Sequence, residues 1–80
     1  MSLQPYVFFE GVGKSPSGLT QIWNVWNKDR SAFLGRVKWW GAFRKYVFFP
    51  EAGTLYDCVC LRDIAQFLVT KTEDHKKVEL

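Results

Sequence analysis

Four short runs of aromatic and β-branched residues are separated by turn-forming residues in the first fifty positions. The runs span residues 5–12, 19–27, 33–40 and 44–49, and residues of these types favour β-strands. Only Gly41 and Ala42 lie at the centre of the last connection, and connections this short join antiparallel neighbours. The pattern predicts four strands that pair in the order of the chain.

Beyond Pro50 the apolar residues recur at the spacing of a helix. Asp57 is a candidate N-cap, because its carboxylate can accept from the unpaired N–H groups of a first helical turn. The pattern predicts an amphipathic helix over residues 58–71, whose apolar face comprises Cys58, Leu61, Ile64, Ala65, Leu68 and Val69. Residues 72–80 are predicted to form a charged tail, frayed or weakly helical, with His75 in solvent.

Together these elements predict an α+β fold with one domain over residues 1–71 and the charged tail over residues 72–80. A four-stranded, mainly antiparallel sheet in meander order is expected, with a single C-terminal helix packed on one face. The expected contacts join Leu61, Ile64, Ala65 and Leu68 of the helix to Val37, Trp39, Tyr46 and Phe48 of the sheet.

Alternation along the strands sorts the side chains onto two faces. In the third run Phe33, Gly35, Val37 and Trp39 share one face, and Leu34, Arg36, Lys38 and Trp40 share the other. A turn with an even number of residues sets Tyr46 and Phe48 beside Val37 and Trp39. In the second run, either Trp23 with Val25 or Ile22 with Trp26 faces inward. The face away from the helix gives the candidate interaction residues: Arg36, Lys38, Trp40, Lys45, Val47 and Phe49.

Charge strengthens this candidate, because the cations gather in the middle of the chain. Aromatic residues make up 18% of the 80 positions, and the formal net charge is +3. Between residues 28 and 45, Asp29 is the acid that stands against Lys28, Arg30, Arg36, Lys38, Arg44 and Lys45. An anionic partner would be attracted there.

Three interpretations of the basic and aromatic face remain open. Single-stranded nucleic acid, or DNA whose major groove receives the sheet, would use stacking rings and phosphate-binding cations. A partner protein or a second copy of the chain would use the same residue types, which are enriched in interfaces. Alternatively, the Lys and Arg stems lie along the rings without any partner. The modest net charge favours a protein interface or self-association, with DNA or RNA as the alternative.

Catalysis, cofactors and metals are not expected. Residues 1–71 contain no histidine and no pair of acids at strand or helix spacing, and Cys60, whose pKa a helix N-terminus could lower, has no evident partner base. Cys58 and Cys60 would point about 200° apart on a helix, so they cannot converge on one metal. Gly13-Lys14-Ser15 matches half of a phosphate-binding loop, but Phe8 stands where the first glycine is needed.

Localisation is expected to be cytoplasmic. The two cysteines are predicted to be free thiols, and the chain shows no secretory signal. No apolar run approaches the length of a membrane span, so no membrane partner is expected.

Three segments, LGRVKWW at 34–40, FRKYVFFP at 43–50 and CLRDIAQFL at 60–68, resemble small proteins of bacteria and their phages. Those proteins combine a glycine-basic-aromatic hairpin with a short helix and carry no settled activity. The resemblance implies a cytoplasmic protein of phage or prophage origin. In architecture alone, the ββββα outline is also similar to the sheet-and-helix DNA-binding domains of some plant transcription factors and phage integrases, which implies possible DNA contacts from exposed strand positions.

Overall fold

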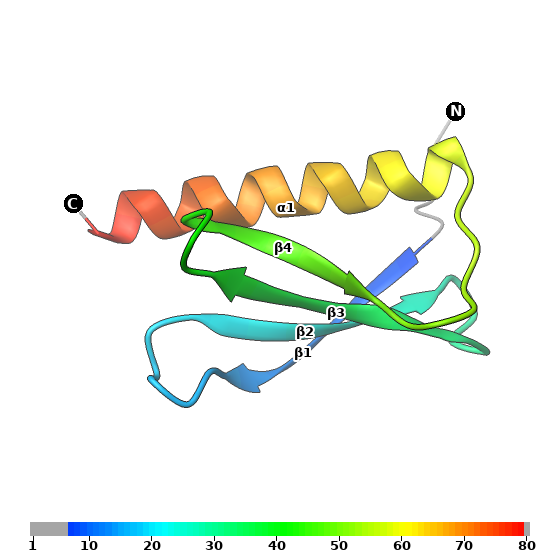
Figure 1. Ribbon diagram of the computed structural model, residues 1–80, viewed down its shortest axis with the longest axis horizontal. Helices are drawn as coiled ribbons and strands as arrows, with labels where there is room; N and C mark the ends of the chain where they lie inside the picture. The colour runs from blue at the N-terminus through cyan, green and yellow to red at the C-terminus, as the bar shows by residue number, and fades with distance from the viewer. Residues whose placement is uncertain (1–6, 80) are drawn as a thin grey trace.

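The computed structural model describes residues 7–79, with side chains as far as residue 77, and it confirms the predicted α+β fold (Figure 1). The antiparallel sheet has the order β1-β2-β3-β4, and one helix follows it. The first predicted strand begins at residue 5, which lies outside the described residues. The elements are β1 Val7–Lys14, β2 Gln21–Asn27, β3 Phe33–Trp40, β4 Lys45–Pro50 and α1 Cys58–Glu79.

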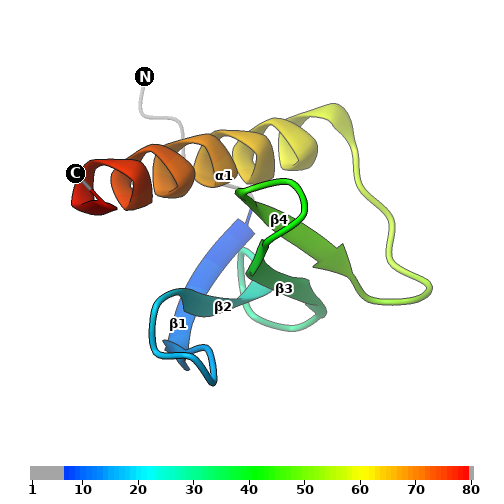
Figure 2. The same cartoon turned by 60° about the vertical axis from the view of Figure 1, so that its left-hand side comes forward.

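Helix α1 covers one face of the sheet, which we call the inner face (Figure 2). The strands twist, so that β1 crosses at a steep angle to β4 and the helix reaches both of these edge strands. Phe67 of α1 stacks on Phe9 of β1 with ring centroids 3.8 Å apart, and its ring edge meets Trp23 of β2 at 5.1 Å. A single helix therefore closes the core of a four-stranded sheet.

Trp23 and Val25 of β2 face inward, which settles the orientation that the sequence left open. Trp23 packs edge-on against Tyr46 of β4 with ring centroids 5.3 Å apart. Such aromatic contacts add to the stabilisation that burial of the rings provides. The buried apolar core comprises Val7, Trp23, Val25, Leu34, Val37, Tyr46 and Ile64.

The predicted helix face is wrong in part. Ile64 is buried and Leu68 packs against the core, but Leu61 is 51% exposed and Ala65 is exposed. The helix is rotated toward its larger side chain, because burying the Phe67 ring removes far more apolar area from water than burying Ala65. The residues turned toward the sheet are Cys60, Ile64, Phe67, Leu68, Lys71, Thr72 and His75.

The predicted helix end is also wrong, because α1 continues to Glu79. Thr72 is buried, and its hydroxyl accepts a hydrogen bond of 3.0 Å from the backbone N–H of Tyr46. The ring of His75, expected in solvent, lies 4.5 Å from that of Trp39. These inward contacts hold the C-terminal turns of the helix, and Lys76 and Lys77 in the last turn suit the negative end of its dipole.

A β-bulge in β3 reverses two further predictions. Val25 pairs with Gly35 and Trp26 pairs with Phe33, so Leu34 is the extra residue between them. Leu34 is consequently buried in the core, whereas Phe33 turns outward and packs edge-on against Trp26 at 5.3 Å. Strict alternation predicted the opposite faces for these two side chains, and this prediction is wrong because alternation fails at a bulge.

Candidate interaction face

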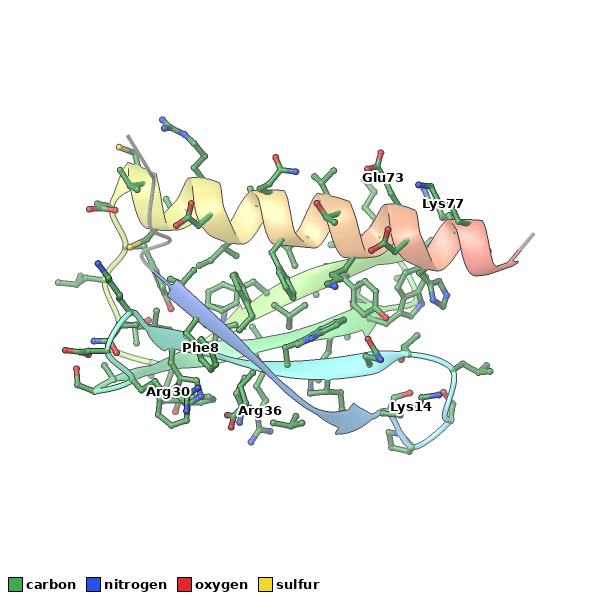
Figure 3. All side chains as sticks on the ribbon, turned by 180° about the vertical axis from the view of Figure 1, so that it is seen from behind. Phe8, Lys14, Arg30, Arg36, Glu73 and Lys77 are labelled. Atoms are coloured by element: carbon green, nitrogen blue, oxygen red, sulfur yellow. The ribbon has the colours of Figure 1, made fainter. Side chains whose placement is uncertain are left out.

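Cross-strand pairing brings the predicted interaction residues together on the outer face, on the side of the sheet away from α1. Directly opposite residues of an antiparallel pair share a face, and the outer pairs of β3 and β4 are Arg36 with Phe49, Lys38 with Val47, and Trp40 with Lys45. This is the predicted register. Figure 3 shows Arg36 pointing away from the helix.

The first two strands add residues that the sequence analysis did not assign to this face. Phe8 of β1 is opposite Trp26 of β2, and Trp26 is opposite Phe33 of β3. Alternation could have found Phe8 once the orientation of β2 was known, whereas the bulge concealed Phe33. We call the whole set the basic-aromatic face: Phe8, Glu10, Ile22, Asn24, Trp26, Arg30, Phe33, Arg36, Lys38, Trp40, Lys45, Val47 and Phe49.

Cations lie against the rings of this face. The guanidinium carbon of Arg30 is 3.9 Å from the centroid of the Phe8 ring, and Lys38 Nζ is 4.7 Å from that of Phe49. Arg36 reaches the ring of Phe33 at 6.0 Å. A cation within about 6 Å of a ring centroid is attracted by the negative face of the ring. Arg30, Arg36 and Lys38 are therefore each paired with an aromatic neighbour on the surface.

Two side-chain hydrogen bonds order the centre of the face. The indole N–H of Trp26 donates to Glu10 Oε1 over 3.0 Å, and Arg36 Nε donates to Asn24 Oδ1 over 3.2 Å. Both bonds join side chains of neighbouring strands. They restrict the rotamers of Trp26 and Arg36, which lowers the entropy that these side chains would lose when a partner binds.

Two hollows flank Lys38 on this face. The larger has a volume of about 400 Å³ and is lined by Phe33, Gly35, Arg36, Lys38, Phe49, Pro50 and Glu51. The smaller, about 300 Å³, lies where the turn after β1 meets Ile22, Lys38, Trp40 and Phe49. Trp40, 45% exposed, stands at the rim of the second hollow. The geometry suits a partner that presents anionic groups next to apolar ones.

The arrangement of residues 7–79 also bears on metal sites, membrane spans and reactive thiols. Within that range, no three His, Cys, Asp or Glu residues stand where they could hold a metal ion. In this part of the chain, helix α1 is not apolar enough to cross a membrane. Cys58 and Cys60 are free thiols. Burial raises the pKa of Cys60, with the nearby Asp57 adding to the shift, which is opposite to the lowering that its place near the helix N-terminus suggested.

The fold and the face together define a small α+β protein with a four-stranded sheet, one covering helix and an open basic-aromatic face. Comparison with known proteins then places the chain. It is 34% identical over 64 residues to a protein of Acholeplasma phage L2 named "Uncharacterized 9.3 kDa protein", and the match covers 80% of this chain and 82% of the phage protein. The chain belongs to the family of this phage protein.

The predicted resemblance to small phage proteins is thereby confirmed at the level of the family. No model of a known protein family matches the chain, and no solved structure matches it.

Proposed function

We propose that the protein is a non-catalytic interaction module whose basic-aromatic face binds an acidic surface on another protein. The observation that carries the proposal is the pairing of cations with rings across this face. Aromatic residues and arginine are the types that interfaces concentrate in their energetically important centres. Open hollows beside Lys38 would receive side chains of the partner.

The partner we propose is a different protein rather than a second copy bound face to face. A two-fold contact sets the same patch of both subunits together. Arg36, Lys38 and Lys45 of one copy would then meet the same cations of the other, and like charges brought together in an interface cost several kcal/mol. An acidic surface would instead be attracted from a distance.

Single-stranded nucleic acid is the second candidate, and one observation favours it. Two rings, Phe33 and Phe49, line the larger hollow together with Arg36 and Lys38, an arrangement in which a base could stack near a phosphate-binding cation. We rank it second because Lys38 and Arg36 already lie against those two rings. A base would have to displace the cations before it could stack.

The test compares two lysine variants that lose the same charge. Lys38→Ala removes a cation from the basic-aromatic face, whereas Lys77→Ala removes one from the side of α1 that points away from the sheet (Figure 3). Each immobilised variant is exposed to an extract of the cells from which the gene comes, and the retained proteins are quantified by mass spectrometry. In parallel, a labelled oligothymidine is titrated with each variant at several salt concentrations.

We expect the wild type and Lys77→Ala to retain an acidic protein that Lys38→Ala does not retain. We expect none of the three to bind the oligonucleotide. Oligonucleotide binding that falls steeply with salt and is weakened only by Lys38→Ala would select the nucleic-acid candidate instead. Equal behaviour of the two variants in both assays would refute any binding role of this face.

A further inference from the structure

A second exposed apolar surface lies on α1, apart from the basic-aromatic face. Leu61 and Val69 are 51% and 52% exposed, and Ala65 between them is also exposed. Residues four apart lie along one side of a helix, so these three side chains form a continuous line that we call the helix stripe. Apolar surface of this kind marks an interaction site when it is contiguous.

The helix stripe borders a groove between α1 and β4. This groove has a volume of about 370 Å³, and its lining is mostly apolar: Lys45, Tyr46, Ala65, Leu68, Val69, Thr72 and Glu73. The stripe and the groove therefore form one surface, in which a protruding side chain, Leu61, stands about three turns of helix from a hollow beside Thr72.

The neighbouring edge of β4 offers little to an added strand. The N–H of Tyr46 already donates to Thr72, and Pro50 at the end of the strand has no N–H to donate. Edge strands protected in these ways resist pairing with another strand. Any occupant of the groove must therefore bind mainly through side chains, as a helix does.

We propose that the helix stripe binds a second copy of this chain, with the two α1 helices antiparallel about a two-fold axis. In this arrangement Ala65 of each copy faces Val69 of the other. Leu61 of each copy then reaches the level of Thr72 and Glu73, where the groove of the other copy receives it. Ala65, as a small residue near the axis, lets the helices approach closely. The contact is self-complementary, as two-fold symmetry requires.

Charge along α1 selects the antiparallel direction. In the antiparallel register Arg62 lies beside Glu73 of the second copy, and Asp57 lies at the level of Lys77 of the second copy. A parallel arrangement would bring Arg62 to Arg62 and Lys77 to Lys77, and such like-charge contacts disfavour a competing arrangement. Glu73 and Lys77 both project from α1 away from the sheet, where a neighbouring helix can reach them (Figure 3).

Sedimentation equilibrium at protein concentrations up to about 1 mM, a range that detects weak association, tests the proposal. We expect a reversible dimer of the 9.4 kDa chain. Val69→Glu places a charge in the contact and should raise the dissociation constant about 100-fold or more. Thr70→Glu, at an exposed position outside the stripe, should leave the constant unchanged. Thermal melts of both variants confirm that they fold.

The register is tested by exchanging charges. Arg62→Glu alone should weaken the dimer about threefold to tenfold, because it removes an ion pair and creates a repulsion. The double variant R62E/E73R should restore the wild-type constant. A monomer at every concentration, a dimer that tolerates Val69→Glu, or additive losses without rescue would each overturn the proposal.

These outcomes are separate from those of the proposed function. A dimer broken by Arg36→Glu and not by Val69→Glu would place self-association on the basic-aromatic face, against both proposals. A wild-type chain that stays monomeric but still retains the acidic partner would overturn the helix contact alone.

Discussion

The two faces of the sheet carry similar residues in different surroundings. On the inner face, rings pack against rings: Phe67 stacks on Phe9 and meets the edge of Trp23. One cation, Lys71, also approaches the inner rings of Trp23 and Phe67. On the outer face cations lie over several rings, as Arg30 does over Phe8 and Lys38 over Phe49. Aromatic content alone therefore does not distinguish core from surface in this chain. Whether a ring belongs to the core or to the surface depends on what covers it. On the outer face, part of this cover consists of charged side chains that a partner can also contact.

The largest expected effect concerns Gly35, at the bulge that sorts Leu34 to one face and Phe33 to the other. A Cβ at Gly35 would collide with the carbonyl oxygen of Phe49, and the φ of +152° is rarely adopted by other residues. Gly35→Ala should cost about 3 kcal/mol or more, since backbone strain and overpacking each cost about 1–3 kcal/mol. Urea unfolding measures the loss. Gly41→Ala, where a Cβ meets nothing within 4 Å, is the control and should change stability by less than about 0.5 kcal/mol.

The two sides of α1 give the next contrast. Ile64 is buried against the sheet and Leu61 is half exposed. Ile64→Ala should lower the free energy of unfolding by about 2–5 kcal/mol, whereas Leu61→Ala should cost less than about 1 kcal/mol, because little of its apolar area leaves water in the monomer. Both are measured by urea unfolding at low protein concentration. Equal losses would mean that α1 is rotated from the orientation described.

Thr72 tests whether the C-terminal turns of α1 belong to the folded unit. Thr72→Val keeps the shape of the side chain but leaves the Tyr46 N–H without its acceptor. An unsatisfied buried donor costs about 1–3 kcal/mol, so we expect a loss of that size in urea unfolding. Thr70→Val, at an exposed position, serves as the control. A Thr72→Val protein as stable as the wild type would support the frayed tail that the sequence predicted.

The smallest effect concerns the start of α1. The backbone N–H of Cys60 donates to Asp57 Oδ1 over 2.9 Å, and this bond lowers the pKa of Asp57 below its ordinary value. A carboxyl group with a lowered folded-state pKa adds stability above its unfolded pKa of about 3.9, and this stability is lost as the pH falls through the folded value. Asp57→Asn keeps a capping side chain but loses the charge.

We expect Asp57→Asn to be slightly less stable than the wild type at pH 7, and we expect the difference to shrink as the pH falls below the unfolded pKa of about 3.9 and through the lowered folded-state pKa. Urea midpoints across this range measure the difference. A difference that stays constant with pH would show that the charge of Asp57 does not contribute to stability.

The sequence predicted most of the fold, because period-two alternation and a short connection were enough to set the β3–β4 register of Trp39 with Tyr46. It failed where local pattern does not determine tertiary contact. The bulge at Leu34 depends on the close approach of Gly35 to the backbone of Phe49 on the neighbouring strand. The sequence of one strand does not reveal this approach. Apolar residues also cover two sides of α1, so the pattern could not show that Phe67 would be buried in preference to Leu61.

For the candidate site too, local pattern predicted some residues, and tertiary contacts determined the others. Arg36, Lys38 and Trp40 could be assigned to one face because they alternate on one strand. Phe33 was assigned to the wrong face, and Phe8 and Arg30 were not assigned, because their places depend on the bulge, on strand pairing and on the positive φ of Arg30 in the turn after β2. The sequence predicted His75 in a solvated tail, whereas its ring lies against Trp39 in the folded part of the helix.

The most direct test of the interaction role is photo-crosslinking from Phe33, which lines the larger hollow of the basic-aromatic face. Benzoylphenylalanine replaces Phe33 in one variant and Leu55, 91% exposed and outside the face, in another, and both are irradiated in the cells from which the gene comes. A discrete protein adduct from position 33 that is absent from position 55 is the predicted result. Adducts from both positions alike, from neither, or only to nucleic acid would contradict the protein-binding role of this face.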